Sequence, residues 1–170
     1  SITAMILHVL KNLNIDFDYM VGAKLEGFDT MVKLTSSAPI IILEGDEYLS
    51  SAIDRRPKFH LYNPNIAVIS GISWDHINVF PTFDIYINQF RIFINSISDT
   101  LIYYEEDTIL NKLTNEKDVC NKIPYSTPKH YINNGSTYVK NTKLLIFGEH
   151  NLQNLNAAKL VCNELGIDDN

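Results

Sequence analysis

Residues 39–47 read Pro-Ile-Ile-Ile-Leu-Glu-Gly-Asp-Glu, a short apolar run that ends abruptly in acidic residues. A second apolar run, Ile66 to Ile69, is followed by Ser70 and Gly71. Continuous β-branched runs of this length are typical of parallel strands that are buried on both faces. The sequence therefore predicts two strands of a parallel sheet, each of which ends in a polar loop.

Helical patterns lie on either side of these runs. Apolar residues recur at helical spacing from Ser1 to Leu13 and again between Pro81 and Ser98, where Thr82 is the expected N-cap. Residues 100–104 then predict another strand. This alternation indicates an α/β fold with a mainly parallel sheet flanked by helices.

The later third of the chain has a different pattern. Residues 107–142 are polar and aromatic, and the turn signal Asn133-Asn134-Gly135 predicts short antiparallel strands. Residues 138–147 are expected to form a strand that enters Gly148. A closing helix with Leu152, Ala158 and Cys162 on one face is expected to end at Gly166. No linker interrupts the chain, so residues 1–170 are predicted to form a single domain.

Composition excludes several classes of protein. The net charge is -6 and the Lys and Arg residues are scattered, which argues against a nucleic-acid partner. The two cysteines, Cys120 and Cys162, lie too far apart for a CxxC metal motif and favour a reducing cytoplasm. The opening apolar run has no basic flank and is too short to span a bilayer, so we expect no signal peptide and no membrane partner.

Charged side chains gather where the two predicted strands end. Glu44, Asp46 and Glu47 follow the first strand, and Asp75 and His76 lie a few residues beyond the second. Ligands of parallel sheets bind at the carboxyl ends of the strands, and these groups suit Mg²⁺, with Mn²⁺ as the alternative because of the imidazole. The competing interpretation is that the acidic residues are turn or cap residues and that Asp75 and His76 form a surface hydrogen bond.

A third polar segment, residues 148–154, reads Gly-Glu-His-Asn-Leu-Gln-Asn. Asn151 and Asn154 share one face of the start of a helix, and their carboxamides can hydrogen-bond a nucleobase edge. Alternatively, Asn151 is simply an N-cap. The dense cationic group Arg55, Arg56 and Lys58 suits either an anionic ligand or a solvated surface.

Taken together, these segments resemble the Mur ligase family. Residues 44–47 resemble its "EADE" strand end, with Gly45 in place of the usual Ala. Asp75-His76 resembles its "DH" metal segment, with Gly71 where an Asn is common. Residues 148–154, followed by Ala157-Ala158, resemble its "G-x-H-N-x-x-N…A-A" adenine segment. The three segments occur in family order and span most of the chain.

The resemblance implies the central, P-loop NTPase-like domain of an ATP-dependent amide ligase that uses ATP and Mg²⁺. It assigns Glu44 and His76 to the metal ion, with Asp46, Glu47 and Asp75 orienting them. It places His150, Asn151 and Asn154 at the adenine. The family's phosphate loop ends in Gly-Lys-Thr before a helix, so its lysine is expected upstream of Ser1. We therefore expect flanking domains outside these residues, no catalytic residue here beyond the metal ligands, and an isolated chain without activity.

The family has several branches. Residues 47–48, 54–59 and 76–81 most resemble the branch that joins the peptide L-Ala-γ-D-Glu-meso-diaminopimelate to UDP-N-acetylmuramate during peptidoglycan recycling. The alternative branch joins L-alanine to the same acceptor in peptidoglycan synthesis, and there Tyr48 would usually be Ser. A folylpolyglutamate-type or cyanophycin-type ligase and a non-catalytic nucleotide-binding module remain further hypotheses.

Overall fold

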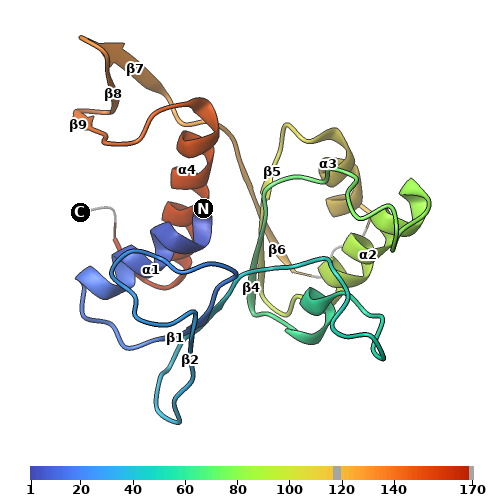
Figure 1. The fold of residues 1–170 in the computed structure, drawn as a ribbon. Helices are drawn as coiled ribbons and strands as arrows, with labels where there is room; N and C mark the ends of the chain where they lie inside the picture. Colours follow the sequence, from blue (N-terminus) through green and yellow to red (C-terminus); the bar gives the residue numbers. More distant parts are fainter. Residues whose placement is uncertain (117–119, 169–170) are drawn as a thin grey trace.

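Three short sheets carry the fold in the computed structural model, which describes residues 1–116 and 120–168 (Figure 1). The first sheet has the order β2-β1-β3, the second β4-β5-β6 and the third β7-β8-β9. The strands are β1 (Asp18–Met20), β2 (Val32–Lys33), β3 (Ile41–Leu43), β4 (Ile66–Ile69), β5 (Thr100–Tyr104), β6 (Asn121–Tyr125), β7 (His130–Asn133), β8 (Ser136–Val139) and β9 (Thr142–Lys143). The helices are α1 (Ile2–Asn12), η1 (Lys58–Leu61), α2 (Phe83–Ser96), α3 (Thr108–Thr114) and α4 (Glu149–Glu164).

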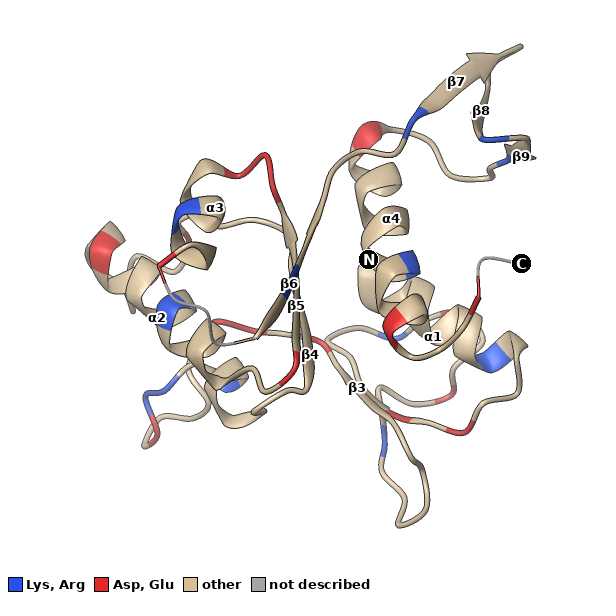
Figure 2. Cartoon of the chain, turned by 180° about the vertical axis from the view of Figure 1, so that it is seen from behind, with Lys and Arg blue, Asp and Glu red and all other residues tan. Residues whose placement is uncertain are grey.

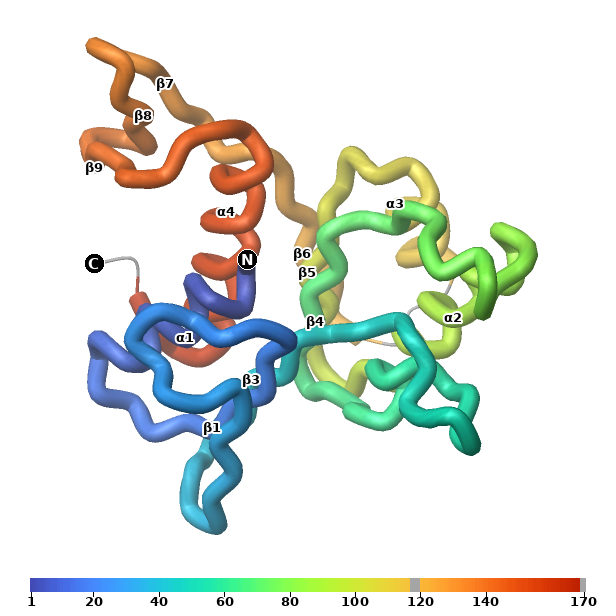
Figure 3. The backbone as a smooth tube through the Cα atoms, viewed as in Figure 1, coloured from blue at the N-terminus to red at the C-terminus, as the bar shows by residue number. Residues whose placement is uncertain are grey.

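The β4-β5-β6 sheet is parallel throughout and separates two apolar cores. Helices α2 and α3 cover one face, and α1 and α4 cover the other (Figures 1 and 3). Successive residues of a strand point to opposite faces, so Leu101 lies in the first core and Ile102 in the second, and both are fully buried. This two-faced burial confirms the predicted α/β class with a parallel sheet.

The β2-β1-β3 sheet is mixed, with β1 parallel to β3 and antiparallel to β2. The expectation that residues 39–43 form a strand buried on both faces is wrong, because Ile41 is 49% exposed and the rest of β3 is half-buried. Within the described residues β3 pairs with β1 alone, so one edge of the strand has no neighbouring strand to cover it.

The helix boundaries confirm the caps predicted at Thr82 and Gly166 and add one at Ser1. Oγ of Ser1 accepts from the N–H of Ala4 at the start of α1, and Oγ1 of Thr82 accepts from the N–H of Ile85 at the start of α2. At the end of α4, Gly166 has a φ of 78° and donates to the carbonyl of Asn163, while the next residue donates to Cys162. These two bonds form a Schellman motif, which explains the glycine.

The segment after Asp107 is only partly as expected. The hairpin of β7 and β8 is confirmed, and Asn134 and Gly135 adopt positive φ in its turn. Helix α3 and strand β6, which extends the parallel sheet, were not predicted. The single strand expected over residues 138–147 is wrong, because Lys140 at φ 52° turns the chain between β8 and β9, and Leu145 and Phe147 are exposed.

Figure 3 shows the third sheet standing apart from the two cores, beyond the first turn of α4. Residues 117–119 and 169–170 lie outside the described part, and the prediction of one domain over residues 1–170 stays a prediction. None of the described helices combines the length and the apolar character that a membrane crossing requires.

Candidate functional site

Glu44 lies where two parallel strands end. Its backbone N–H donates to the carbonyl of Met20 in β1 (2.9 Å), and its Oε2 accepts from the backbone N–H of Gly22 (2.6 Å). A Cβ on Gly22 would lie 3.2 Å from that oxygen, which leaves little room for a side chain. The Glu44 carboxylate is therefore held at the carboxyl edge of the sheet, where parallel sheets bind ligands.

The structure brings Glu47, from the loop after β3, together with Asp75 and His76, from the loop after β4. Nε2 of His76 lies 3.6 Å from Oε1 of Glu47 and 4.0 Å from Oδ2 of Asp75, and the three ligand atoms lie within 4.8 Å of one another. Glu44 is not a member of this group. The two strand ends thus supply one cluster, while the roles of Glu44 and His76 as the metal-ligand pair stay predictions.

The backbone around His76 is specialised. His76 has a φ of 54°, a left-handed backbone conformation that is uncommon for residues other than glycine. Its carbonyl accepts from the N–H groups of Val79 and Phe80, and its N–H donates to Oδ1 of Asp75 (2.6 Å). Tyr48 packs its ring edge-on against the imidazole with the centroids 4.9 Å apart. These contacts fix the imidazole beside Glu47.

Asp107 holds the same loop from the other side and was not found by sequence analysis. Its Oδ1 caps α3 by accepting from the N–H groups of Ile109 and Leu110, and its Oδ2 accepts from the N–H of Ile72 (2.7 Å). Gly71 has a φ of 147°, and a Cβ there would lie 3.2 Å from Oδ2 of Asp107. This close approach explains why glycine occupies the position. The sequence signal that could have pointed to Asp107 is that Asp is a preferred N-cap residue, which suggests that a helix starts there.

Glu47 has a second partner below the cluster. The hydroxyl of Tyr86, on α2, donates to Oε1 of Glu47 (3.3 Å), the same oxygen that faces His76. Burial raises the pKa of Tyr86, and the neighbouring Glu47 carboxylate raises it further. Sequence analysis predicted a helix between Pro81 and Ser98 and did not connect Tyr86, which lies on it, with the site.

In the segment that follows β3, Lys58 forms an ion pair with Asp46 and Arg56 forms one with Asp54. Burial raises the pKa of Asp46, but the Lys58 ammonium and the N–H of Tyr48 outweigh it, so this pKa lies below its usual value. Arg56 pairs with Asp54 (2.7 Å). Within the described residues Arg55 makes no ion pair. Arg56 and Lys58 therefore stabilise the loop in this structure.

The start of α4 contradicts one of the two interpretations of its asparagines and leaves the nucleobase interpretation a prediction. The N-cap is Gly148, so the expectation that Asn151 is the N-cap is wrong, and its Nδ2 donates back to the carbonyl of Phe147 (2.9 Å). His150 is exposed and Asn154 is buried. Two further amides of the helix were missed. Gln153 donates to Tyr104 and Thr127, and Asn156 donates to the carbonyl of Ser126. They attach α4 to the end of the parallel sheet.

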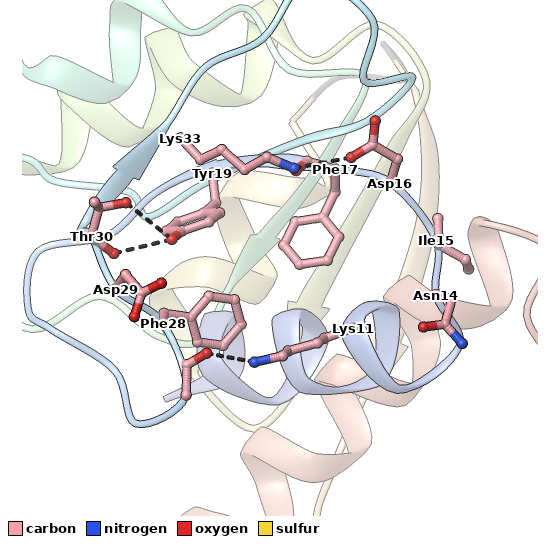
Figure 4. Close-up of a pocket in the computed structure, with 11 residues that line it drawn as sticks. Lys11, Asn14, Ile15, Asp16, Phe17, Tyr19, Phe28, Asp29, Thr30 and Lys33 are labelled. Atoms are coloured by element: carbon pink, nitrogen blue, oxygen red, sulfur yellow. Dashed lines mark hydrogen bonds and ion pairs between the residues drawn. The ribbon is translucent and has the colours of Figure 1, made fainter.

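A cavity of about 560 Å³ lies elsewhere, between α1 and the loop that joins β1 to β2 (Figure 4). Phe17, Tyr19 and Phe28 form its floor, with Lys11 and Lys33 at its rim. None of the predicted site residues lines it. Figure 2 shows the Lys and Arg residues of the described part of the chain distributed over separate elements.

The fold and site together define an α/β domain in which two carboxylates and an imidazole, those of Glu47, Asp75 and His76, cluster at strand ends. The chain belongs to the Mur ligase middle domain family, whose model matches residues 2–162.

Two curated relatives illustrate the family. A UDP-N-acetylmuramate–L-alanyl-γ-D-glutamyl-meso-2,6-diaminoheptandioate ligase of Haemophilus influenzae is 32% identical over 95 residues, which cover 56% of this chain and 21% of the relative. A UDP-N-acetylmuramate–L-alanine ligase of Streptococcus agalactiae is 25% identical over 186 residues, which cover 99% of this chain and 38% of the relative. The chain therefore spans well under half the length of these proteins.

Solved structures share the fold. The UDP-N-acetylmuramate:L-alanyl-γ-D-glutamyl-meso-diaminopimelate ligase from Neisseria meningitides has a TM-score of 0.83 and 19% identity, and the match covers 98% of this chain and 58% of that one. A MurF ligase from Thermotoga maritima in complex with ADP has a TM-score of 0.66 and 17% identity, with 98% and 43% covered.

Proposed function

We propose that this chain is the nucleotide-binding part of an ATP-dependent ligase that forms an amide bond to the carboxylate of UDP-N-acetylmuramate. The observation that carries the proposal is the group Glu47, Asp75 and His76 at the strand ends of a Mur ligase middle domain. The names of the relatives support the acceptor, and the ADP complex of a structural neighbour supports the nucleotide.

The donor set fits a divalent cation. Mg²⁺ takes oxygen ligands, and the carboxylates of Glu44, Glu47 and Asp75 offer them at the strand ends. Nε2 of His76 lies 3.6 Å and 4.0 Å from carboxylate oxygens of Glu47 and Asp75, close enough for these two carboxylates to orient the imidazole. The imidazole makes Mn²⁺ the alternative. We propose Glu44 and His76 as direct ligands and Asp46, Glu47 and Asp75 as the residues that orient them.

The chain's own residues then position the reacting groups. Glu44, held by the amide of Gly22, presents a carboxylate at the sheet edge, and His76 presents Nε2, which must be unprotonated to bind a metal. When bound, the cation neutralises phosphate charge during transfer. The acceptor carboxylate takes the γ-phosphoryl group and ADP leaves. An amine then attacks the acyl carbon, an amide bond forms, and inorganic phosphate departs.

For the adenine end we propose His150, Asn151 and Asn154 at the start of α4. Asn151 donates through Nδ2 to Phe147, and because no described residue donates a hydrogen bond to its Oδ1, this oxygen can accept from an exocyclic amine. His150 is exposed and able to stack on a base. The free thiols of Cys120 and Cys162 support our inference that the enzyme works in a reducing cytoplasm.

For the amine substrate we propose the peptide L-Ala-γ-D-Glu-meso-diaminopimelate, used in peptidoglycan recycling. Tyr48 and residues 54–59 support it by resemblance, and Tyr48 contacts the imidazole of His76 directly. The second candidate is L-alanine, favoured by the relative that matches 99% of this chain.

The test is ligation by the full-length protein that carries these residues. UDP-N-acetylmuramate and ATP are supplied with either the tripeptide or L-alanine, and phosphate release is followed. Tripeptide-dependent release supports the recycling ligase, and alanine-dependent release supports the second candidate. No release with either amine would contradict the ligase proposal and favour a different acceptor or a non-catalytic module.

A further inference from the structure

Tyr86 lies deep in the core beneath the cation-ligating cluster. It is 2% exposed and packs against Phe80 and Phe90, with ring centroids 5.4 Å and 5.2 Å away. A phenylalanine would satisfy this packing equally well, so the apolar contacts do not explain the hydroxyl. A buried tyrosine hydroxyl normally has a hydrogen-bond partner. Here the partner is Oε1 of Glu47 at 3.3 Å.

The same oxygen faces His76. Oε1 of Glu47 lies 3.6 Å from Nε2 of His76, so the hydroxyl and the imidazole converge on one carboxylate atom from two different elements. Resting on the proposed function, we propose that Tyr86 is a positioning residue, whose hydroxyl holds the Glu47 carboxylate in place beside His76 for cation binding.

The chemistry of the contact supports this role. A glutamate side chain has three rotatable torsions, and the Glu47 side chain is 29% exposed, so a single contact with His76 leaves it several orientations. The ring of Tyr86 is held between Phe80 and Phe90 and cannot follow such motion. Its O–H donates to one lone pair of Oε1 and leaves the other lone pair free to face the imidazole of His76. Partners of this kind orient the ligands of metal sites.

Tyr86→Phe removes this hydrogen bond and keeps the ring. The matched control is Tyr103→Phe, which deletes a hydroxyl from a buried tyrosine of the same core. Among the described residues, no hydrogen bond joins the Tyr103 hydroxyl to Glu47, Asp75 or His76, whereas Tyr86 bonds Glu47. Mn²⁺ affinity of the full-length protein that carries these residues is measured by electron paramagnetic resonance. The metal-free chain is examined by NMR for the carboxyl ¹³C shift of Glu47 and the Nε2 shift of His76.

We expect Tyr86→Phe to weaken Mn²⁺ binding about tenfold, with both NMR shifts displaced, and Tyr103→Phe to change neither. Both variants should unfold at similar temperatures. Unchanged shifts in metal-free Tyr86→Phe, or an Mn²⁺ affinity equal to that of the parent chain, would overturn the proposal.

A second comparison separates this inference from the proposed function. If His76→Asn, which removes a proposed direct ligand, also leaves Mn²⁺ affinity unchanged, the cation site itself is wrong. The NMR shifts still decide whether Tyr86 positions Glu47, because they are measured without metal.

Discussion

The backbone N–H of Gly22 donates to Oε2 of Glu44 across a distance of 2.6 Å and joins the loop after β1 to the end of β3. An acidic side chain that is bonded to a main-chain amide keeps its carboxylate in one orientation. The contact also makes the orientation depend on a glycine, because a Cβ at position 22 would lie 3.2 Å from that oxygen.

Gly22→Ala is expected to displace the Glu44 carboxylate by a few tenths of an ångström. Small misplacements of catalytic groups reduce rates strongly, so we expect a loss of about tenfold in ligation by the full-length protein. Gly45→Ala is the matched control, since nothing lies within 4 Å of a Cβ there. Equal rates for the two variants would show that the Gly22–Glu44 contact has no functional role.

Glu44→Ala is expected to abolish ligation while leaving the fold intact, because it removes the predicted metal ligand. Glu47→Gln keeps the shape of its side chain and should reduce activity less, since we assign Glu47 an orienting role. Steady-state rates and circular dichroism spectra of both variants check this order. The reverse order would make Glu47 the direct ligand, as its 3.6 Å separation from His76 allows.

Asp107→Ala is expected to destabilise the protein by about 2–4 kcal/mol, because it removes an N-cap and a charged hydrogen bond to the loop that carries His76. Thr82→Ala removes the cap of α2 alone and should cost about 1 kcal/mol. Urea unfolding of both variants measures the difference. Equal losses would mean that the contact between Asp107 and Ile72 adds nothing to stability.

The ion pair between Asp54 and Arg56 can be tested at low pH. Hydrogen bonds from the side chain and backbone of Arg56 lower the pKa of Asp54 from its ordinary 3.8 to about 2. A lowered folded-state pKa stabilises the protein above pH 3.8, and this contribution disappears as the pH falls towards 2. NMR titration should return the Asp54 pKa towards 3.8 in Arg56→Ala and leave it low in Arg55→Ala. A low value in both variants would contradict the pairing.

The elements that sequence analysis found are those with long or regular apolar patterns. Helix α2 and strand β5 were predicted to within a few residues because their side chains pack against a continuous core. Strand β6 was missed because Asn121, Lys122 and Pro124 are poor strand formers, and this strand lies at the edge of its sheet, where proline is tolerated. Helix α3 has only seven residues, too few for a clear period.

The site was predictable as a location but not in its contacts. The strand-end rule placed Glu47 and His76 at the same edge of the fold, and the structure brings them together. Which of Glu44 and Glu47 faces the imidazole depends on how the chain turns after β3, and spacing does not encode this. Tyr86 approaches from a helix 39 residues further along the chain than Glu47, so its contact is visible only in three dimensions.

The left-handed backbone at His76 restricts which substitutions are informative there. Alanine at this position would remove the imidazole and also strain the turn whose carbonyl accepts from Val79 and Phe80, so lost activity would mix two causes. Asparagine tolerates this conformation better and removes the imidazole alone. In evolutionary terms, a descendant that had abandoned catalysis would be expected to drift towards asparagine or glycine here. The amino acid that related proteins carry at this position therefore indicates whether the chemistry is still under selection.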